Sequence, residues 1–300
     1  MTTTLQFRND EFYHLCGELA EQAPEFFAAR VHQPVFIIGA PRSGTTLLLK
    51  LLAAHPEVIA FRREANEYWH PRFYPWRNCD ETVNVPPYEI DPKAFTEASV
   101  RQFSAVDEQR LRALFGVAQV LGRGRQVIGK SAMLSLMVPQ ILQRFSDARL
   151  VHVVRDGRAA ACSRAIKEHD KMRRYEPVYR RRGVYRSFDE LLTDVARSWA
   201  SAVEAVMQED QVLELSSGGR LLTIYYEQLC ADPDRQLSRL QEWLGLSQPV
   251  RCPDALRPRS RNSKYRQVLP TATISRLERL MAGSLRRAGY PVGPFEEERA

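Results

Sequence analysis

Cysteine is scarce in this chain, and the few cysteines form no pattern. Five are scattered over 300 residues. Their number is odd and no two are separated by two residues, which argues against a disulfide framework and against a thiolate zinc site. The six histidines show no paired spacing typical of metal ligands. The sequence therefore predicts no bound metal.

Long apolar runs are also missing. A helix that spans a bilayer needs about 18 consecutive apolar residues, whereas the apolar run that starts at Leu47 is broken by Lys50. The residues before Val31 mix acids and bases and lack the basic start and apolar stretch of a secretory signal. We therefore expect no membrane span and a cytoplasmic location.

Lysine is rare, and arginine takes its place. The 43 basic residues comprise six lysines and 37 arginines and, against 36 acids, give a net charge of +7. Arginine binds planar and tetrahedral oxyanions through forked hydrogen bonds. The balance is compatible with phosphate, sulfate or nucleic acid as a partner, but a genome rich in arginine codons would give the same count. Charge alone does not choose among them.

The pattern of apolar runs predicts the fold class. Short buried-type strands alternate with amphipathic helices, which is typical of a parallel sheet covered on both faces. We predict an α/β protein with a P-loop-like parallel sheet flanked by helices, in a single domain over residues 1–300. The expected strands are 35–39, 126–129, 149–154 and 221–225, and the expected helices are 10–30, 45–54, 98–121, 134–145, 190–208, 234–244 and 271–289.

Three segments lie outside this alternation. Residues 1–33 form an N-terminal helical segment before the first strand. Residues 68–92 are rich in proline and aromatic side chains and predict an irregular excursion from the sheet. Residues 168–188 interleave arginine with tyrosine, which suggests either stacking and phosphate contacts with nucleic acid or a solvated charged loop.

A phosphate-binding loop frame follows the first predicted strand. Gly39 and Gly44 enclose four residues between a buried strand and a helix, as in G-x-x-x-x-G. Backbone N–H groups and the helix N-terminus converge on an anion in such loops. Thr45 stands where ATP and GTP enzymes need lysine, and the cation is inside the loop, at Arg42. The loop predicts an anion site without the lysine and Mg²⁺ arrangement that splits nucleoside triphosphates.

A second candidate anion site follows the third predicted strand. Arg155 comes directly after Val154, Asp156 is placed to cap the next helix, and Ser163 follows two helical turns later. Ligands of open α/β sheets bind at the carboxyl ends of the strands. Alternatively, Arg155 pairs with Asp156 or another acid. Two anion sites on neighbouring strands would suit a nucleotide phosphorylated at both ends of its ribose.

These motifs together resemble the PAPS-dependent sulfotransferase superfamily, where PAPS is 3′-phosphoadenosine 5′-phosphosulfate. The resemblance rests on the loop 39–46 with His55-Pro56 after it, on Arg155-Asp-Gly-Arg with Ser163, and on Tyr225-Tyr-Glu-Gln-Leu229 with Trp243-Leu-Gly245. Their order and spacing match over residues 35–289. The residues of these motifs are most similar to those of tyrosylprotein sulfotransferases and bacterial relatives.

The resemblance implies a role for each matching residue. It implies that Arg42, Ser43, Gly44, Thr45 and Thr46 hold the 5′-phosphosulfate of PAPS. It implies that Arg155 and Ser163 hold the 3′-phosphate, that Tyr226 lies near the adenine, and that Lys130 approaches the sulfuryl group. The basic segment 257–266 falls where relatives close a loop over the 3′-phosphate, although a solvated basic segment is the alternative. The resemblance also implies that residues 168–188 form a flap over the substrate. The implied reaction is an EC 2.8.2 transfer of the sulfuryl group to a hydroxyl or amine, with PAPS as co-substrate and no metal.

The resemblance also suggests where the general base lies. Cytosolic relatives use a histidine just after the Lys130 position, but this chain has Ala132 and Met133 there. Tyrosylprotein and heparan-type relatives take a glutamate from beyond the His-Pro pair. We expect Glu64 to be the base, with Glu67 second and His70 third. Either glutamate could instead pair with a neighbouring arginine.

Two other functions compete with this one. The first is a kinase or other phosphotransferase that uses ATP with a variant loop, against which Thr45 argues. The second is an RNA- or polyanion-binding protein, suggested by the basic charge and the arginine–tyrosine stretch, but it leaves both strand-end motifs unexplained. We expect a small-molecule, carbohydrate, lipid or peptide acceptor as partner and no nucleic acid. The sequence is compatible with a homodimer.

Overall fold

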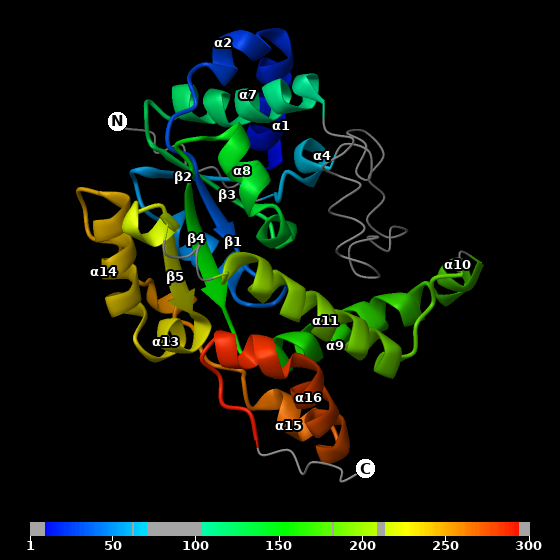
Figure 1. Cartoon of the computed structure of the whole chain (residues 1–300). Coiled ribbons are helices and arrows are strands. Elements are labelled where there is room, and N and C mark those ends of the chain that lie inside the picture. The colour runs from blue at the N-terminus through cyan, green and yellow to red at the C-terminus, as the bar shows by residue number, and fades with distance from the viewer. Residues whose placement is uncertain (1–9, 62, 71–103, 182, 209–213, 294–300) are drawn as a thin grey trace.

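The computed structural model describes residues 10–61, 63–70, 104–181, 183–208 and 214–293. Within them, five strands form one parallel sheet in the order β2-β3-β1-β4-β5 (Figure 1). The strands are β1 (Val35–Ile38), β2 (Val58–Ala60), β3 (Gln126–Lys130), β4 (Arg149–Val154) and β5 (Leu221–Tyr225). The predicted parallel α/β fold is confirmed, and β2 is a strand that the sequence analysis did not predict.

Alternate residues of the central strands face opposite sides of the sheet. Phe36 and Ile38 of β1 join the apolar core on one side, whereas Val35 and Ile37 join the core on the other. Both faces of the sheet are therefore covered by apolar side chains, which is why the central strands consist mainly of apolar residues. Because β3 and β4 flank β1 in a single parallel sheet, the ends of these three strands form one edge.

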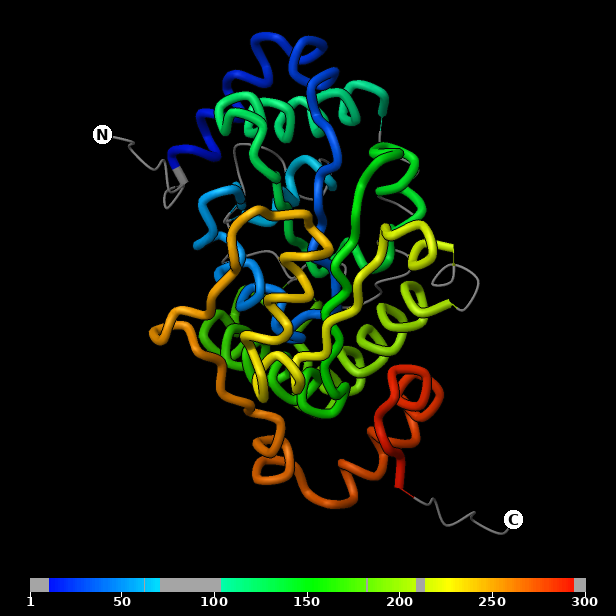
Figure 2. The backbone as a smooth tube through the Cα atoms, turned by 90° about the vertical axis from the view of Figure 1, so that its left-hand side faces the viewer, coloured from blue at the N-terminus to red at the C-terminus, as the bar shows by residue number. Residues whose placement is uncertain are grey.

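Helices cover both faces. On one side lie α1 (Asp10–Gln22), α2 (Pro24–Ala28), α7 (Ala105–Leu121) and α8 (Val138–Arg144), and on the other α3 (Thr45–Leu52) and α14 (Pro233–Leu244). A third apolar cluster joins α9 (Gly157–Arg174), α11 (Phe188–Val206) and α16 (Thr271–Arg287) near the carboxyl ends of the strands (Figure 1). The backbone trace in Figure 2 shows α7 near the top of the molecule and α16 near the bottom.

The remaining elements are short. They are α4 (Asn66–Trp69), η1 (Met133–Leu136), α10 (Glu176–Arg181), α13 (Tyr226–Ala231), η2 (Asp254–Leu256) and α15 (Lys264–Val268). Tyr226 begins α13 directly at the end of β5, so that the chain turns at the same edge as the other strand ends. No described helix is both long and apolar enough to cross a membrane.

The predicted helices differ from the observed ones in detail. The helical segment predicted over 10–30 is interrupted at Pro24, as its sequence leads us to expect, and forms two helices, because proline lacks the N–H that an uninterrupted helix needs. The helix predicted over 134–145 is the 3₁₀ turn η1 followed by α8. The helix predicted from 98 is described only from Ala105, where α7 begins. Most of the excursion predicted over 68–92 lies outside the described residues.

The segment 168–188 is mainly helical, in contrast to the loop that the sequence suggested. Helix α9 continues to Arg174, α10 covers Glu176–Arg181, and α11 starts at Phe188. Met172 and Tyr179 are buried in the third apolar cluster. These two side chains hold the segment against the rest of the protein, while most of its arginines lie on the exposed side. Its role as a flap over the substrate stays a prediction.

Candidate active site

The glycine frame of the first loop is required by its backbone. Gly39 has φ of 148° and Gly44 has φ of 102°, values that side-chain-bearing residues rarely adopt. A Cβ at Gly39 would lie 2.3 Å from the carbonyl oxygen of Val153 in β4. A Cβ at Gly44 would lie 2.8 Å from the Tyr226 ring. The loop therefore packs closely on both β4 and α13.

Hydrogen bonds hold this loop and leave the start of α3 open. The Gly39 N–H donates to the Ser135 hydroxyl over 2.8 Å, a buried contact. Gly44 is the N-cap of α3 and provides no side chain to bond the first N–H groups of the helix. Ser43 is 1% exposed, and its hydroxyl has no hydrogen-bond partner among the described residues. The first backbone N–H groups of α3 therefore have no side-chain cap, as is usual at anion-binding helix starts.

Arg155 connects the two predicted anion sites. Its Nη1 donates to the carbonyl oxygen of Arg42 over 2.9 Å, and its guanidinium lies 4.5 Å from the centre of the Tyr226 ring. Arg155 is only 7% exposed, and this burial lowers its pKa. Trp199 donates to the carbonyl oxygen of Arg155 over 3.2 Å. The predicted capping of α9 is confirmed, because the Asp156 side chain accepts from the Arg158 N–H.

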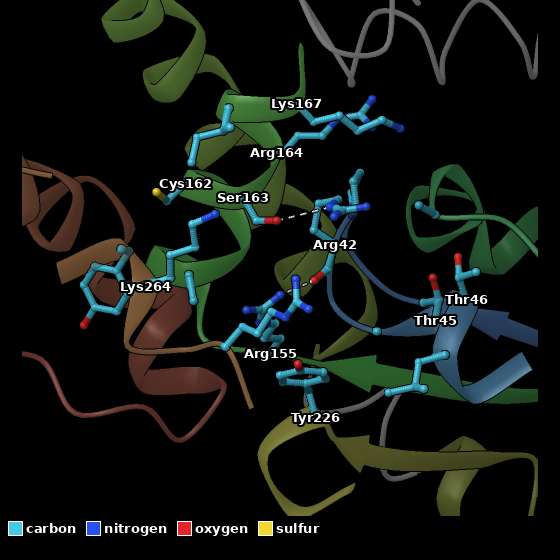
Figure 3. Close-up of a pocket in the computed structure, with 18 of the residues that line it drawn as sticks. Arg42, Thr45, Thr46, Arg155, Cys162, Ser163, Arg164, Lys167, Tyr226 and Lys264 are labelled. Atoms are coloured by element: carbon cyan, nitrogen blue, oxygen red, sulfur yellow. Dashed lines mark hydrogen bonds between the residues drawn. The ribbon is translucent and has the colours of Figure 1, made fainter. Parts of the chain in front are cut away.

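Ser163 lies beside the first loop. The Nε of Arg42 donates to the Ser163 hydroxyl over 3.2 Å, and Figure 3 shows the two side chains pointing toward each other. The contact joins the loop after β1 to helix α9 after β4. The structure therefore brings together residues that are far apart in the sequence.

Lys130 and Glu64 form a salt bridge at the end of β3. The ammonium of Lys130 also donates to the Thr46 hydroxyl over 3.1 Å. Lys130 is 7% exposed, whereas the Glu64 side chain is 32% exposed. Lys130 therefore lies between Thr46 at the start of α3 and the partly exposed carboxylate of Glu64.

The other two candidate bases lie away from the cavity. Glu67 accepts a hydrogen bond from the Tyr13 hydroxyl over 2.9 Å. His70 is 1% exposed, and burial, with the nearby charge of Arg144, lowers the pKa of His70 to about 3. Neither residue lines the cavity described next. Of the three candidates, the structure places only Glu64 at the cavity.

One cavity of about 640 Å³ collects most of the predicted residues, a volume usual for a small-ligand site. The predicted residues that line it are Arg42, Gly44, Thr45, Thr46, Glu64, Lys130, Arg155, Ser163 and Tyr226. Arg261 and Lys264 of the basic segment 257–266 line it as well. Together with Arg164, Lys167 and Asp170, this makes seven cations and two acids in the wall, which favours an anionic ligand.

Sequence analysis missed three charged residues of this wall, namely Arg164, Lys167 and Asp170. They follow Ser163 on α9, and Lys167 is one helical turn beyond it on the same face. This spacing was a signal that the sequence analysis could have used. Partial burial lowers the pKa of Lys167, and the charges of Arg164 and Arg42 lower it further. Arg164 pairs with Glu168 over 3.0 Å.

A model of the Sulfotransferase family matches residues 34–249. Because the match covers well over half of the chain, the chain belongs to that family. This agrees with the resemblance found from the motifs. Among the described residues, no group of three or more His, Cys, Asp or Glu side chains is arranged to hold a metal ion.

Similar proteins with curated names include sulfotransferases of two kinds. Protein-tyrosine sulfotransferase 2 of Gallus gallus is 26% identical over 225 residues, which covers 71% of this chain and 51% of that protein. The omega-hydroxy-beta-dihydromenaquinone-9 sulfotransferase Stf3 of Mycobacterium tuberculosis is 28% identical over 253 residues, which covers 71% of this chain and 63% of that protein. The chain thus spans about half to two thirds of the length of such relatives.

Solved structures support the fold. Sulfotransferase STF9 of Mycobacterium avium superposes with a TM-score of 0.57 at 15% identity, covering 92% of this chain and 82% of that one. The sulfotransferase domain of the curacin biosynthetic pathway superposes with a TM-score of 0.52 at 18% identity, covering 88% of this chain and all of that one. The shared architecture agrees with the P-loop-like sheet.

Proposed function

We propose that this chain is a PAPS-dependent sulfotransferase that transfers the sulfuryl group to a hydroxyl of its acceptor. The observation that carries the proposal is one cavity at the carboxyl ends of β1, β3 and β4, lined by several cations. We assign its cations and hydroxyls to two anion-binding groups, one on the side of Lys130 and one on the side of Arg155. A donor that is phosphorylated at one end of its ribose and phosphosulfated at the other needs two such groups.

The residues present fit that donor. Arg42, Lys130 and the backbone donors before α3 would hold the phosphosulfate, with Thr45 and Thr46 at the helix start. The close approach of Gly44 to Tyr226 leaves no room for a side chain between loop and ring. This packing supports a role for Tyr226 in forming the floor of the nucleotide site, beside the adenine.

The 3′-phosphate would be bound by Arg155 and Ser163. Arg155 is buried and held by two hydrogen bonds, to Arg42 and to Asn262, so little rotamer entropy is lost when it binds an anion. Arg261 and Lys264 line the same cavity and would supply further positive charge.

Glu64 would act as the general base. PAPS supplies an activated sulfuryl group. The acceptor oxygen forms a bond to sulfur, the bond from sulfur to the 5′-phosphate oxygen breaks, and the acceptor proton moves to the Glu64 carboxylate. The products that leave are the sulfated acceptor and PAP, which is adenosine 3′,5′-bisphosphate. Lys130 contacts both Glu64 and Thr46, so it is placed to neutralise charge on the donor beside the base.

The acceptor is proposed at the level of its reacting group. Two of the relatives are named for a protein tyrosine and for an omega-hydroxy menaquinone, whose reacting groups are a phenol and an alcohol. A hydroxyl acceptor is common to both, and a carboxylate general base suits it.

The Glu64→Gln variant tests this function. We expect it to bind PAP as the wild type does and to lose about 10²–10⁴ in turnover, the usual contribution of a general base. Transfer from ³⁵S-labelled PAPS to phenols, sugars, lipids and tyrosine peptides measures turnover, and calorimetry measures PAP binding. Glu67→Gln is the matched control and should stay active. Full activity in Glu64→Gln would show that another group acts as the general base.

A further inference from the structure

A carboxylate outside the cavity wall is the centre of the hydrogen bonds around Arg155. Glu227, on α13, accepts from the backbone N–H of Asp156 over 3.1 Å and from the Tyr290 hydroxyl over 2.8 Å. It also accepts from the side-chain amide of Asn262. Three donors from three segments therefore meet at one side chain that itself does not line the cavity.

Asn262 links Glu227 to Arg155 through its side-chain amide. Its amide nitrogen donates to Glu227, and its amide oxygen accepts from Arg155 Nε over 2.8 Å. A guanidinium has five N–H donors in a fixed plane. Asn262 and the carbonyl oxygen of Arg42 occupy one donor each, which fixes the plane and leaves the other donors for a ligand.

Glu227 also affects the charge of Arg155. Burial lowers the pKa of Arg155, while the negative charge of Glu227 acts in the opposite direction. The carboxylate is itself satisfied by its three donors. It can therefore support the charge of Arg155 without facing the ligand.

The segment after α16 is attached to both sides of the turn between β4 and α9. Tyr290 bonds Glu227 on one side. On the other side, Arg158 Nη1 donates to the carbonyl oxygen of Pro291 over 3.1 Å, and Arg158 pairs with Asp156 over 2.8 Å. Burial and the nearby Glu227 charge raise the pKa of Tyr290, so the phenol keeps the proton that it donates.

Asn262 and Tyr290 both lie beyond residue 249, where the family match ends. We infer that Tyr290, through Glu227 and then Asn262, positions Arg155 for the 3′-phosphate. All three are positioning residues and not contacts of the phosphate. The inference rests on the proposed function and specifies which residues outside the cavity set its selectivity for a 3′-phosphorylated nucleotide.

The test compares two nucleotides that differ only in the 3′-phosphate. We expect Tyr290→Phe to weaken PAP binding about three- to tenfold, the loss of part of one charge-assisted hydrogen bond, and to leave AMP binding within about twofold. Calorimetry on the full chain gives both dissociation constants. The Tyr185→Phe variant is the control, because Tyr185 also packs beside the third apolar cluster and no hydrogen bond of its hydroxyl is found among the described residues.

A double-mutant cycle separates positioning from general structure. In an Arg155→Gln background, Tyr290→Phe should have no further effect on PAP binding, because its effect passes through Arg155. An unchanged PAP affinity in Tyr290→Phe would overturn the inference. So would an equal loss for PAP and AMP, or the same loss with Arg155 already replaced. If the wild type itself binds PAP no better than AMP, the proposed function fails instead.

Discussion

At the scale of single residues, Thr45 and Arg42 define what the loop after β1 can bind. Thr45 replaces the lysine of nucleoside triphosphate enzymes, and Arg42, at φ of 70°, carries the cation within the loop. From the sequence we predict that Arg42 and Ser163 bind opposite ends of one donor, and the structure joins the two side chains by a hydrogen bond. The sequence ranks Glu64 before Glu67 and His70 through the resemblance alone. It does not show that Glu67 bonds Tyr13 or that His70 is buried near the charge of Arg144, because no local pattern encodes these tertiary contacts.

Lys167 gives a prediction for pH dependence. Its pKa is lowered by partial burial and then by the charges of Arg164 and Arg42, so it loses its proton at a lower pH than an ordinary lysine, whose pKa is about 10.4. An anion in the cavity favours the charged form and raises this pKa. We therefore expect PAP binding to take up protons in the alkaline range and to weaken as the pH rises there.

Calorimetry of PAP binding in buffers of different ionisation enthalpy measures that proton uptake. Lys167→Arg should reduce it, because arginine keeps its charge over the whole range. Lys50→Arg changes an exposed lysine on α3 outside the cavity and should leave it as in the wild type. Identical uptake in wild type and Lys167→Arg would show that another group is responsible.

At the scale of elements, strongly patterned segments were predictable and short ones were not. β4 and β5 were predicted with the observed bounds, since apolar and β-branched residues dominate each of them. β2 has three residues, too few to show a period. The continuation of α9 and the helix α10 were not predicted in the basic stretch after Asp170. Its few buried residues, such as Met172 and Tyr179, are separated by arginines, so that no apolar helical pattern is visible. Asn262 and Tyr290 carried no motif, and only tertiary contacts identify them.

The junction of β1 and the loop gives a prediction for stability. At Gly39 an added methyl group would meet the Val153 carbonyl oxygen at 2.3 Å, in a backbone conformation that is itself strained for alanine. We expect Gly39→Ala to lower the free energy of unfolding by about 2 kcal/mol or more, the sum of overpacking and strain. Urea denaturation measures the change.

Gly124→Ala is the matched control for this clash. Gly124 also has a positive φ, of 77°, but an added Cβ would meet nothing within 4 Å. This variant should show only the cost of the left-handed conformation, about 1 kcal/mol. Equal losses in the two variants would mean that β4 moves away from the loop without cost.

At the scale of the whole molecule, the sheet order explains why distant motifs meet. The chain places β3 on one side of β1 and β4 on the other, so the crevice at the strand ends opens where the direction of winding changes. Lys130, the loop after β1 and Arg155 enter it from three neighbouring strands. The C-terminal helices then close the same edge, and α15 and α16 lie there in Figure 1.

The central claim is that this crevice binds a doubly phosphorylated adenosine, and ligand-induced thermal stabilisation tests it most directly. PAP with EDTA, ATP with Mg²⁺ and an RNA oligonucleotide are compared on the wild type and on Arg42→Glu and Arg155→Glu. A ligand at 100 times its Kd adds about 2.7 kcal/mol to the stability of the folded chain. We predict a shift of about 2 °C or more with PAP that both charge reversals abolish. Stabilisation by ATP with Mg²⁺ or by RNA alone, or a PAP shift that survives both reversals, would contradict the account.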